Sequence, residues 1–336
     1  MDRRGFVTIT GMALAALATS WAEAPSAFAS ALDGDRVTDQ MVTTIEQRVN
    51  TLRSLDDQLG GARLLDQARG DLSLITSLLQ SGRYTEKVGL RLHALAAWVC
   101  SITGWMAFDS GLSSASQQYY AGALRASKSA GEPAFGAYVL AEMGVIAESG
   151  DPRDRVQLVT TAIDNAPKSL PPAAWSHLHL HLAEALSTTG RHQQAGVSLG
   201  RATDMWDRHT TGGEDRPEWL DWYGPAQLAS TEGKVLLRAG RTDLAAASLE
   251  QSINEAAPRD KAARSARLAE ARLSGKDLDG ALDAANKGAE LLEGQVTSAR
   301  ATTRLNEFSA KLKPYSRVPE VAQFRERLRA LPQLSD

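Results

Sequence analysis

The sequence predicts an all-α fold, a right-handed α-solenoid of antiparallel helix pairs over residues 36–331. Ala and Leu dominate its apolar residues, and only 6% of all residues are aromatic. Ala and Leu favour helices, whereas a sheet protein would use more Val, Ile, Tyr and Phe. Glycines and small residues also recur at fixed offsets, as expected of helix pairs that stack on their neighbours. Such an array needs no single core, so a chain of 336 residues does not require two domains.

Five glycines mark the predicted turns between the two helices of a pair. They are Gly111, Gly150, Gly190, Gly240 and Gly275. A residue just past a helix end often has a positive φ, which glycine adopts most readily. The positions at +5, +9 and +12 from each glycine are then expected to pack against the first helix of the pair. We expect positive φ at these turns, above all at Gly190 and Gly240.

A small residue is expected seven positions before each turn, where the two helices of a pair touch. Gly104, Ala183 and Gly233 fit this position, whereas Met143 and Leu268 do not. The offsets resemble those of tetratricopeptide repeats, with irregular spacing between the turns. We therefore interpret the chain as a series of tetratricopeptide-like pairs with lengthened helices or insertions.

The remaining helices are predicted from their apolar stripes and their glycine and proline breaks. We expect helices over about 36–58, 62–80 and 86–109 before the first turn. After the last turn we expect helices to about residue 292, over 297–313 and over 319–330. The longest loop is expected from Asp207 to Pro217, where a Thr-Thr-Gly-Gly run precedes the proline.

Residues 1–35 form a signal-like or linker segment. Arg3-Arg4 precedes an apolar run, and Ala27-Phe28-Ala29 fits a small-x-small cleavage site, as in a twin-arginine export signal. The alternative is an internal linker whose arginine pair is incidental. The apolar run is too short to span a bilayer, and no later segment is long and apolar enough. We expect no membrane span.

Several strings resemble the C-terminal regions of actinobacterial helix-turn-helix regulators that carry tetratricopeptide repeats. They are residues 53–61 (RSLDDQLGG), 103–109 (TGWMAFD), 217–222 (PEWLDW) and 298–315. The resemblance covers nearly the whole chain from about residue 36, and it implies a sensor or interaction solenoid in the cytoplasm. No helix-turn-helix precedes the repeats in this sequence, so the chain resembles either a shortened member or a member whose sequence starts at an internal Met. Direct DNA binding by this chain is not expected. The net charge of −3 agrees with that expectation.

No residue constellation points to catalysis. His177 and His181 share a helix face with Glu184, and such a set could ligate a metal. We interpret these residues instead as packing and groove-lining side chains, with no metal and no cofactor. Cys100 stands alone in an apolar stretch, so we expect a buried, unreactive thiol and no disulfide. The chain is therefore not expected to be an enzyme.

The concave groove is expected along the first helices of the pairs. Numbering the small residue as position 8, positions 2, 5, 9, 12 and 13 face the groove. The predicted ligand-binding residues are Trp98, Trp105, Asp109, His177, Glu184, Gln227, Lys234 and Arg238. This order gives an aromatic end, an acidic and imidazole middle and a basic end. Such a gradient suits a short peptide, with its carboxylate at Lys234 or Arg238 and its apolar end at Trp105.

These expectations describe a regulatory or interaction module that binds a peptide, a small signal molecule or a protein partner. A homodimer is left open. The alternative is an exported, folded binding protein delivered by the twin-arginine route. Cleavage of residues 1–29 separates the two hypotheses.

Overall fold

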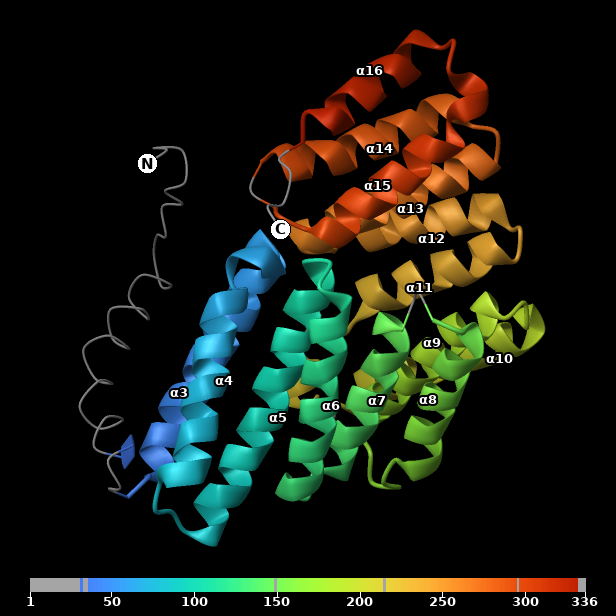
Figure 1. The fold of residues 1–336 in the computed structure, drawn as a ribbon. Coiled ribbons are helices and arrows are strands. Elements are labelled where there is room, and N and C mark those ends of the chain that lie inside the picture. Colours follow the sequence, from blue (N-terminus) through green and yellow to red (C-terminus); the bar gives the residue numbers. More distant parts are fainter. Residues whose placement is uncertain (1–30, 33–35, 148–149, 214–215, 295, 332–336) are drawn as a thin grey trace, which may run out of the picture.

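The computed structural model describes residues 31–32, 36–147, 150–213, 216–294 and 296–331. The described part is a right-handed α-solenoid, with no β-strand in these ranges (Figure 1). Helices α3 (Asp39–Leu59) and α4 (Leu65–Ser81) lie between residue 36 and the first pair. The twin-arginine-like segment lies outside the described residues. Within the described residues, no helix is both long and apolar enough to cross a membrane.

Five antiparallel helix pairs form the body of the solenoid. They are α5 (Glu86–Asp109) with α6 (Ser113–Ala130), α7 (Pro133–Ile146) with α8 (Pro152–Asn165), α9 (Pro172–Thr188) with α10 (His192–Gly212), α11 (Pro225–Arg238) with α12 (Thr242–Asn254), and α13 (Pro258–Ser274) with α14 (Leu278–Glu293). The helices α15 (Ala299–Lys311) and α16 (Pro319–Arg329) complete the C-terminal end. The predicted pairs are therefore confirmed as tetratricopeptide-like repeats.

The small residues of the first helices lie where the two helices of a pair touch. A Cβ atom on Gly104 would come within 2.7 Å of the Tyr120 ring, and one on Gly233 would come within 2.5 Å of Leu249. In the second pair the close contact is made by Gly144, against Val159. Counting back seven residues from Gly150 gives Met143, which does not fit, because Gly144 stands only six residues before that glycine.

Three of the five turn glycines have the predicted left-handed backbone. φ is +82° at Gly111, +75° at Gly190 and +77° at Gly240. Gly150 is not among the positive-φ residues, and Gly275 has φ −78°. In the last pair the left-handed residue is Lys276, with φ +67°.

The turn of the last pair therefore lies one residue later than predicted, at Lys276 instead of Gly275. The amide of Asp277 donates to the carbonyl of Arg272, as the amide of Arg241 donates to that of Leu236. Counting from Lys276 places Ala281, Ala285 and Gly288 on the buried face, and these three residues are buried. The predicted Gly280 and Lys287 do not lie on this buried face. Gly280 is only partly buried, and Lys287 is exposed.

The predicted loop from Asp207 to Pro217 is mostly helical. Helix α10 continues to Gly212, and the Thr210 and Thr211 hydroxyls donate to the carbonyl of Asp207. The helix ends at Gly213, where φ is +66°. A short 3₁₀ helix, Glu218–Leu220, then leads into α11.

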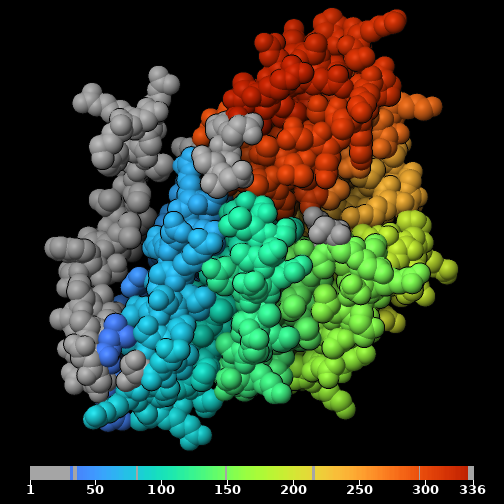
Figure 2. All heavy atoms as spheres, in the orientation of Figure 1, coloured from blue at the N-terminus to red at the C-terminus, as the bar shows by residue number. Residues whose placement is uncertain are grey.

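The two ends of the solenoid meet. Helix α3 packs on α13, and α15 packs on α5, so the C-terminal helices rest against the N-terminal ones (Figure 2). The amide of Thr297 donates to the carbonyl of Leu59 at 2.9 Å. A Cβ atom on Gly60 would lie 2.1 Å from the carbonyl oxygen of Thr297, so this contact requires a glycine. These contacts bring the N-terminal and C-terminal helices together beside the concave face.

Candidate ligand-binding chamber

The concave face of the solenoid holds a pocket of about 330 Å³, called the chamber below. This volume is at the lower end of the range of small-molecule sites. Helices α3, α5, α7, α9, α11, α13 and α15 all contribute side chains to its wall. The first helices of the repeats therefore line one shared cavity, as the repeat pattern predicts.

One wall of the chamber is aromatic. It is built by Trp98, Trp105 and Phe108 of α5, and by Trp219 and Trp222 of the segment that joins α10 to α11. The rings of Trp105 and Phe108 lie 5.7 Å apart. These side chains are partly buried rather than fully packed in the core. They offer flat apolar surface to a ligand.

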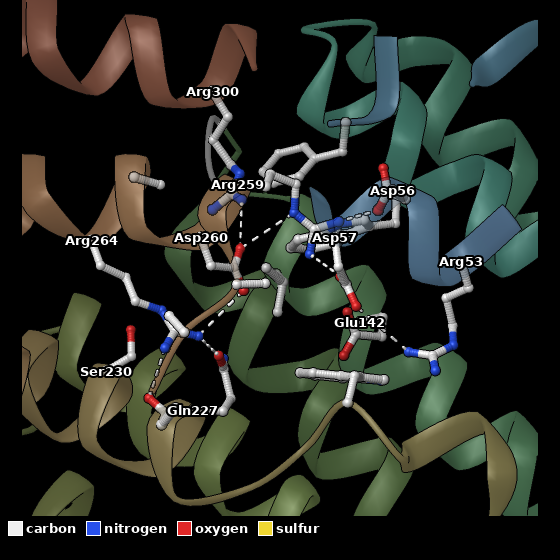
Figure 3. Close-up of a pocket in the computed structure, with 18 of the residues that line it drawn as sticks. Arg53, Asp56, Asp57, Glu142, Gln227, Ser230, Arg259, Asp260, Arg264 and Arg300 are labelled. Carbon is white, nitrogen blue, oxygen red and sulfur yellow. Dashed lines mark hydrogen bonds and ion pairs between the residues drawn. The ribbon is translucent and has the colours of Figure 1, made fainter. Parts of the chain in front are cut away.

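Another part of the chamber wall is a network of paired charges centred on Asp260. Its carboxylate accepts hydrogen bonds from Arg264 and Arg300, both at 3.3 Å, and it also pairs with Arg259 at 3.4 Å (Figure 3). Burial alone would raise the pKa of Asp260, but the three guanidinium groups outweigh burial and hold that pKa well below its usual value. Asp260 is therefore ionised at neutral pH and fixes the orientation of three cations.

The aromatic and charged walls are joined at Trp105. The guanidinium carbons of Arg259 and Arg300 lie 5.6 Å and 5.2 Å from the centre of its ring. A cation over an indole face is a favourable arrangement, and more so where water is excluded. Arg300 also donates to Asp109 at 3.0 Å. These contacts hold both arginines against the Trp105 ring.

A second buried ion pair lies between α9 and α11. Lys234 donates to Glu184 at 2.7 Å, and Arg155 approaches the same carboxylate at 3.9 Å. Arg238 donates to the hydroxyl of Ser187 at 3.0 Å. Lys234 and Arg238 thus lie on the Glu184 side of the solenoid. Lys234 and Glu184 line the chamber, whereas Arg238 is not part of its wall.

Two histidines and one glutamate converge at another point of the wall. The Nε2 atom of His177 lies 2.9 Å from Oε1 of Glu142 and 2.9 Å from Nε2 of His181. The Nε2 atom of His181 lies 3.3 Å from the same oxygen. Glu142 comes from α7, so it occupies the place that the sequence suggested for Glu184. All three side chains are buried, and His181 and Glu142 line the chamber.

The structure brings most of the predicted ligand-binding residues together. Five of them line the chamber: Trp98, Trp105, Glu184, Gln227 and Lys234. Two are buried beside it, Asp109 under Arg300 and His177 under His181. Cys100 is buried as expected, and burial raises the pKa of its thiol to about 11, so the thiol stays protonated at neutral pH.

Sequence reasoning missed the charged residues that close the chamber. They include Arg53, Asp56, Asp57, Glu142, Arg259, Asp260, Arg264 and Arg300. A signal existed for Glu142, which stands two residues before Gly144, as His181 stands two residues before Ala183. Equivalent positions of successive repeats lie side by side on the concave face. The fixed offset of seven residues gave Met143, which does not fit, instead of Gly144, and this hid the relation.

No family model and no curated protein matches the chain. Among solved structures, NprR in complex with its cognate peptide NprX is similar with a TM-score of 0.54 and 12% identity. That match covers 89% of this chain and 79% of the NprR chain. BtubC from P. vanneervenii gives a TM-score of 0.44 at 13% identity, over 68% of this chain and 89% of that one. The Cut9–Hcn1 hetero-tetramer of APC/C gives 0.41 at 16%, over 78% and 52%. The likeness to NprR shows the fold.

Proposed function

We propose that this chain is a non-enzymatic regulatory module that binds a short peptide in the central chamber. The observation that carries the proposal is the closure of both solenoid ends around a chamber with an aromatic wall and a wall of ordered charges. NprR, which shares the fold, was solved with a bound peptide. A peptide combines the apolar side chains, backbone amides and terminal charges that such walls would recognise.

The size of the chamber favours a short ligand over a folded partner. A volume of about 330 Å³ accommodates a small molecule or a few residues of extended chain, but not a protein domain. The apolar end of the peptide would lie against Trp98 and Trp105. Its terminal carboxylate would approach Lys234, whose ammonium group carries three donors and shares Glu184 with Arg155.

The proposal is tested with an equimolar pool of synthetic tripeptides and tetrapeptides passed over the immobilised full chain. Retained peptides are identified by mass spectrometry, resynthesised with a free or an amidated C-terminus, and titrated by calorimetry. Trp98→Leu should weaken binding by at least about tenfold, since an aromatic anchor carries much of the binding energy. Trp175→Leu is the matched control, because Trp175 stacks on His179 and does not line the chamber.

Three outcomes would contradict parts of this proposal. If no peptide is retained by the wild type above the level retained by Trp98→Leu, the chamber is not a peptide site. If both tryptophan variants bind equally well, the ligand lies elsewhere on the solenoid. If amidation of the peptide leaves the affinity unchanged, Lys234 does not receive the carboxylate.

We further propose that the module acts in the cytoplasm, in the manner of regulators whose repeats are coupled to a helix-turn-helix domain. The resemblance of residues 53–61 and 298–315 to such regulators supports this assignment. The alternative is export by the twin-arginine route. Mass spectrometry of the protein from its natural cell separates the two. A chain that retains Arg3 and Arg4 in the cell fraction supports regulation, whereas a chain that begins at Ser30 in the medium supports export.

A further inference from the structure

Glu142, His177 and His181 form a buried group in which the close contacts cannot all be hydrogen bonds. Three polar atoms, one oxygen and two imidazole nitrogens, lie within 2.9–3.3 Å of one another. They are held on two rigid helices, with His177 and His181 four residues apart on α9 and Glu142 on α7. Their side chains are 1–4% exposed. Water therefore does not separate them.

With an ionised carboxylate and neutral rings, no placement of the ring protons suits all three contacts. If both Nε2 atoms carry a proton, two N–H groups face each other between His177 and His181. If only His177 carries it, the lone pair of His181 faces the oxygen of Glu142. If only His181 carries it, the lone pair of His177 faces that oxygen. An unsatisfied contact between buried polar atoms is costly.

One ligand atom from each of the three side chains lies within 4.8 Å of the other two, which is close enough for all three to hold one ion. A neutral imidazole and a carboxylate are the forms that ligate metals.

A cation placed among the three atoms resolves the conflict, because all three lone pairs then point at positive charge. A tetrahedral ion with metal–ligand distances of about 2.0–2.1 Å keeps its ligand atoms about 3.3 Å apart. The three atoms stand at 2.9, 2.9 and 3.3 Å, so they need to move by only a few tenths of an ångström. Two imidazoles and one carboxylate are ligands suited to a first-row divalent metal.

We propose that Glu142, His177 and His181 form a binding site for a divalent transition metal ion of the Zn²⁺ class. His181 and Glu142 line the central chamber, so the ion enters from the chamber and its fourth coordination position faces that space. Three protein ligands with one open position are typical of sites where the metal meets water or a ligand group. This inference goes beyond the proposed peptide binding, and it stands or falls independently of any peptide.

The test uses the full, tag-free chain, stripped of metal with EDTA and dialysed. Zinc chloride is titrated by calorimetry, and cobalt chloride by visible absorption, since tetrahedral Co²⁺ absorbs strongly. We expect one ion per chain. Glu142→Gln and His181→Asn should each weaken binding by at least about tenfold, because even residues that only support a metal ligand contribute that much. His179→Asn is the matched control, since His179 lies on the same helix and stacks on Trp175 instead.

X-ray absorption at the zinc edge of the wild type keeps the test decisive if a variant does not fold. Two imidazole ligands together with oxygen ligands would support the site. The proposal is overturned if the wild type takes up no stoichiometric zinc, if the absorption spectrum shows no imidazole ligation, or if His179→Asn weakens binding as much as His181→Asn. Peptide is absent from every measurement, so failure of the peptide proposal leaves these results interpretable.

Discussion

Asp56 of α3 accepts a hydrogen bond from Arg259 of α13, although 203 residues separate them in the sequence. Both side chains are buried, and the same guanidinium group reaches Asp57 at 3.0 Å. The contact joins the first described helix to the last repeat pair, beside the chamber. Closure of the solenoid and the charged wall of the chamber therefore depend on the same residues.

Removal of the Arg259 guanidinium should open this closure. Arg259→Gln leaves the buried carboxylate of Asp56 without its cation, and loss of one member of a buried pair costs about 3–5 kcal/mol. We expect the free energy of unfolding, measured by urea denaturation, to fall by about 3–5 kcal/mol. Lys287→Gln is the control, because Lys287 pairs with Asp283 on an exposed helix face. Equal losses in the two variants would show that the Asp56–Arg259 contact does not hold the ends together.

The left-handed turn residues give opposite predictions at two equivalent positions. Gly190→Val should lower the free energy of unfolding by about 1–2 kcal/mol, because a β-branched residue is strained at φ +75°. Lys276→Gly should raise it by about 1 kcal/mol, since it relieves a non-glycine residue at φ +67°. Thermal melting measures both changes. A destabilising Lys276→Gly would show that the last turn is not built like the others.

The helix contacts also predict opposite effects of one substitution at two glycines. Gly233→Ala would bring a methyl group within 2.5 Å of Leu249 and 3.1 Å of the Ala245 carbonyl, so we expect a loss of about 1–3 kcal/mol. Gly196→Ala, on the exposed face of α10 with nothing within 4 Å, should instead stabilise by about 0.5–1 kcal/mol through helix propensity. Urea midpoints compare the two variants. A tolerated Gly233→Ala would mean that α11 and α12 pack less closely than the structure shows.

The helix pairs were predictable because their signals are local. A turn needs a left-handed residue, and a close helix contact needs a small one. The sequence therefore identifies Gly190 as a turn residue, and Gly104 and Gly233 as contact residues. The last pair was misplaced for the same reason. The turn was assigned to Gly275 because it is a glycine, whereas the left-handed residue is its neighbour Lys276. A lysine does not indicate a left-handed turn position.

The candidate site was predictable only where it follows the repeat register. Trp98, Trp105 and Lys234 were found because each has a fixed offset from a small residue. The pairs Asp56–Arg259 and Asp109–Arg300 were not, because they depend on the curvature summed over every repeat. That curvature arises from many small packing angles between neighbouring pairs, and no local pattern records where the two ends meet.

The ion pair between Glu184 and Lys234 predicts a loss of stability in acid. Burial would raise the pKa of Glu184, but Lys234, Arg155 and Arg238 outweigh burial and hold that pKa well below its usual value. In the unfolded chain this glutamate has an ordinary pKa of about 4.3. Near and below that pH, the unfolded chain therefore binds a proton that the folded chain does not. The stabilisation is fully present above that pH, and it is lost as the pH falls toward the folded pKa.

Glu184→Gln isolates this contribution. At pH 7 the variant should be less stable than the wild type by about 2 kcal/mol or more, because the buried amino group of Lys234 loses its partner. Between pH 5 and pH 3 the wild type should lose stability faster than the variant, so their urea midpoints converge. Glu250→Gln, which removes the half-exposed partner of Arg272, should differ little from the wild type at either pH. A gap between wild type and Glu184→Gln that stays constant down to pH 3 would mean that Glu184 is not held ionised by the cations around it.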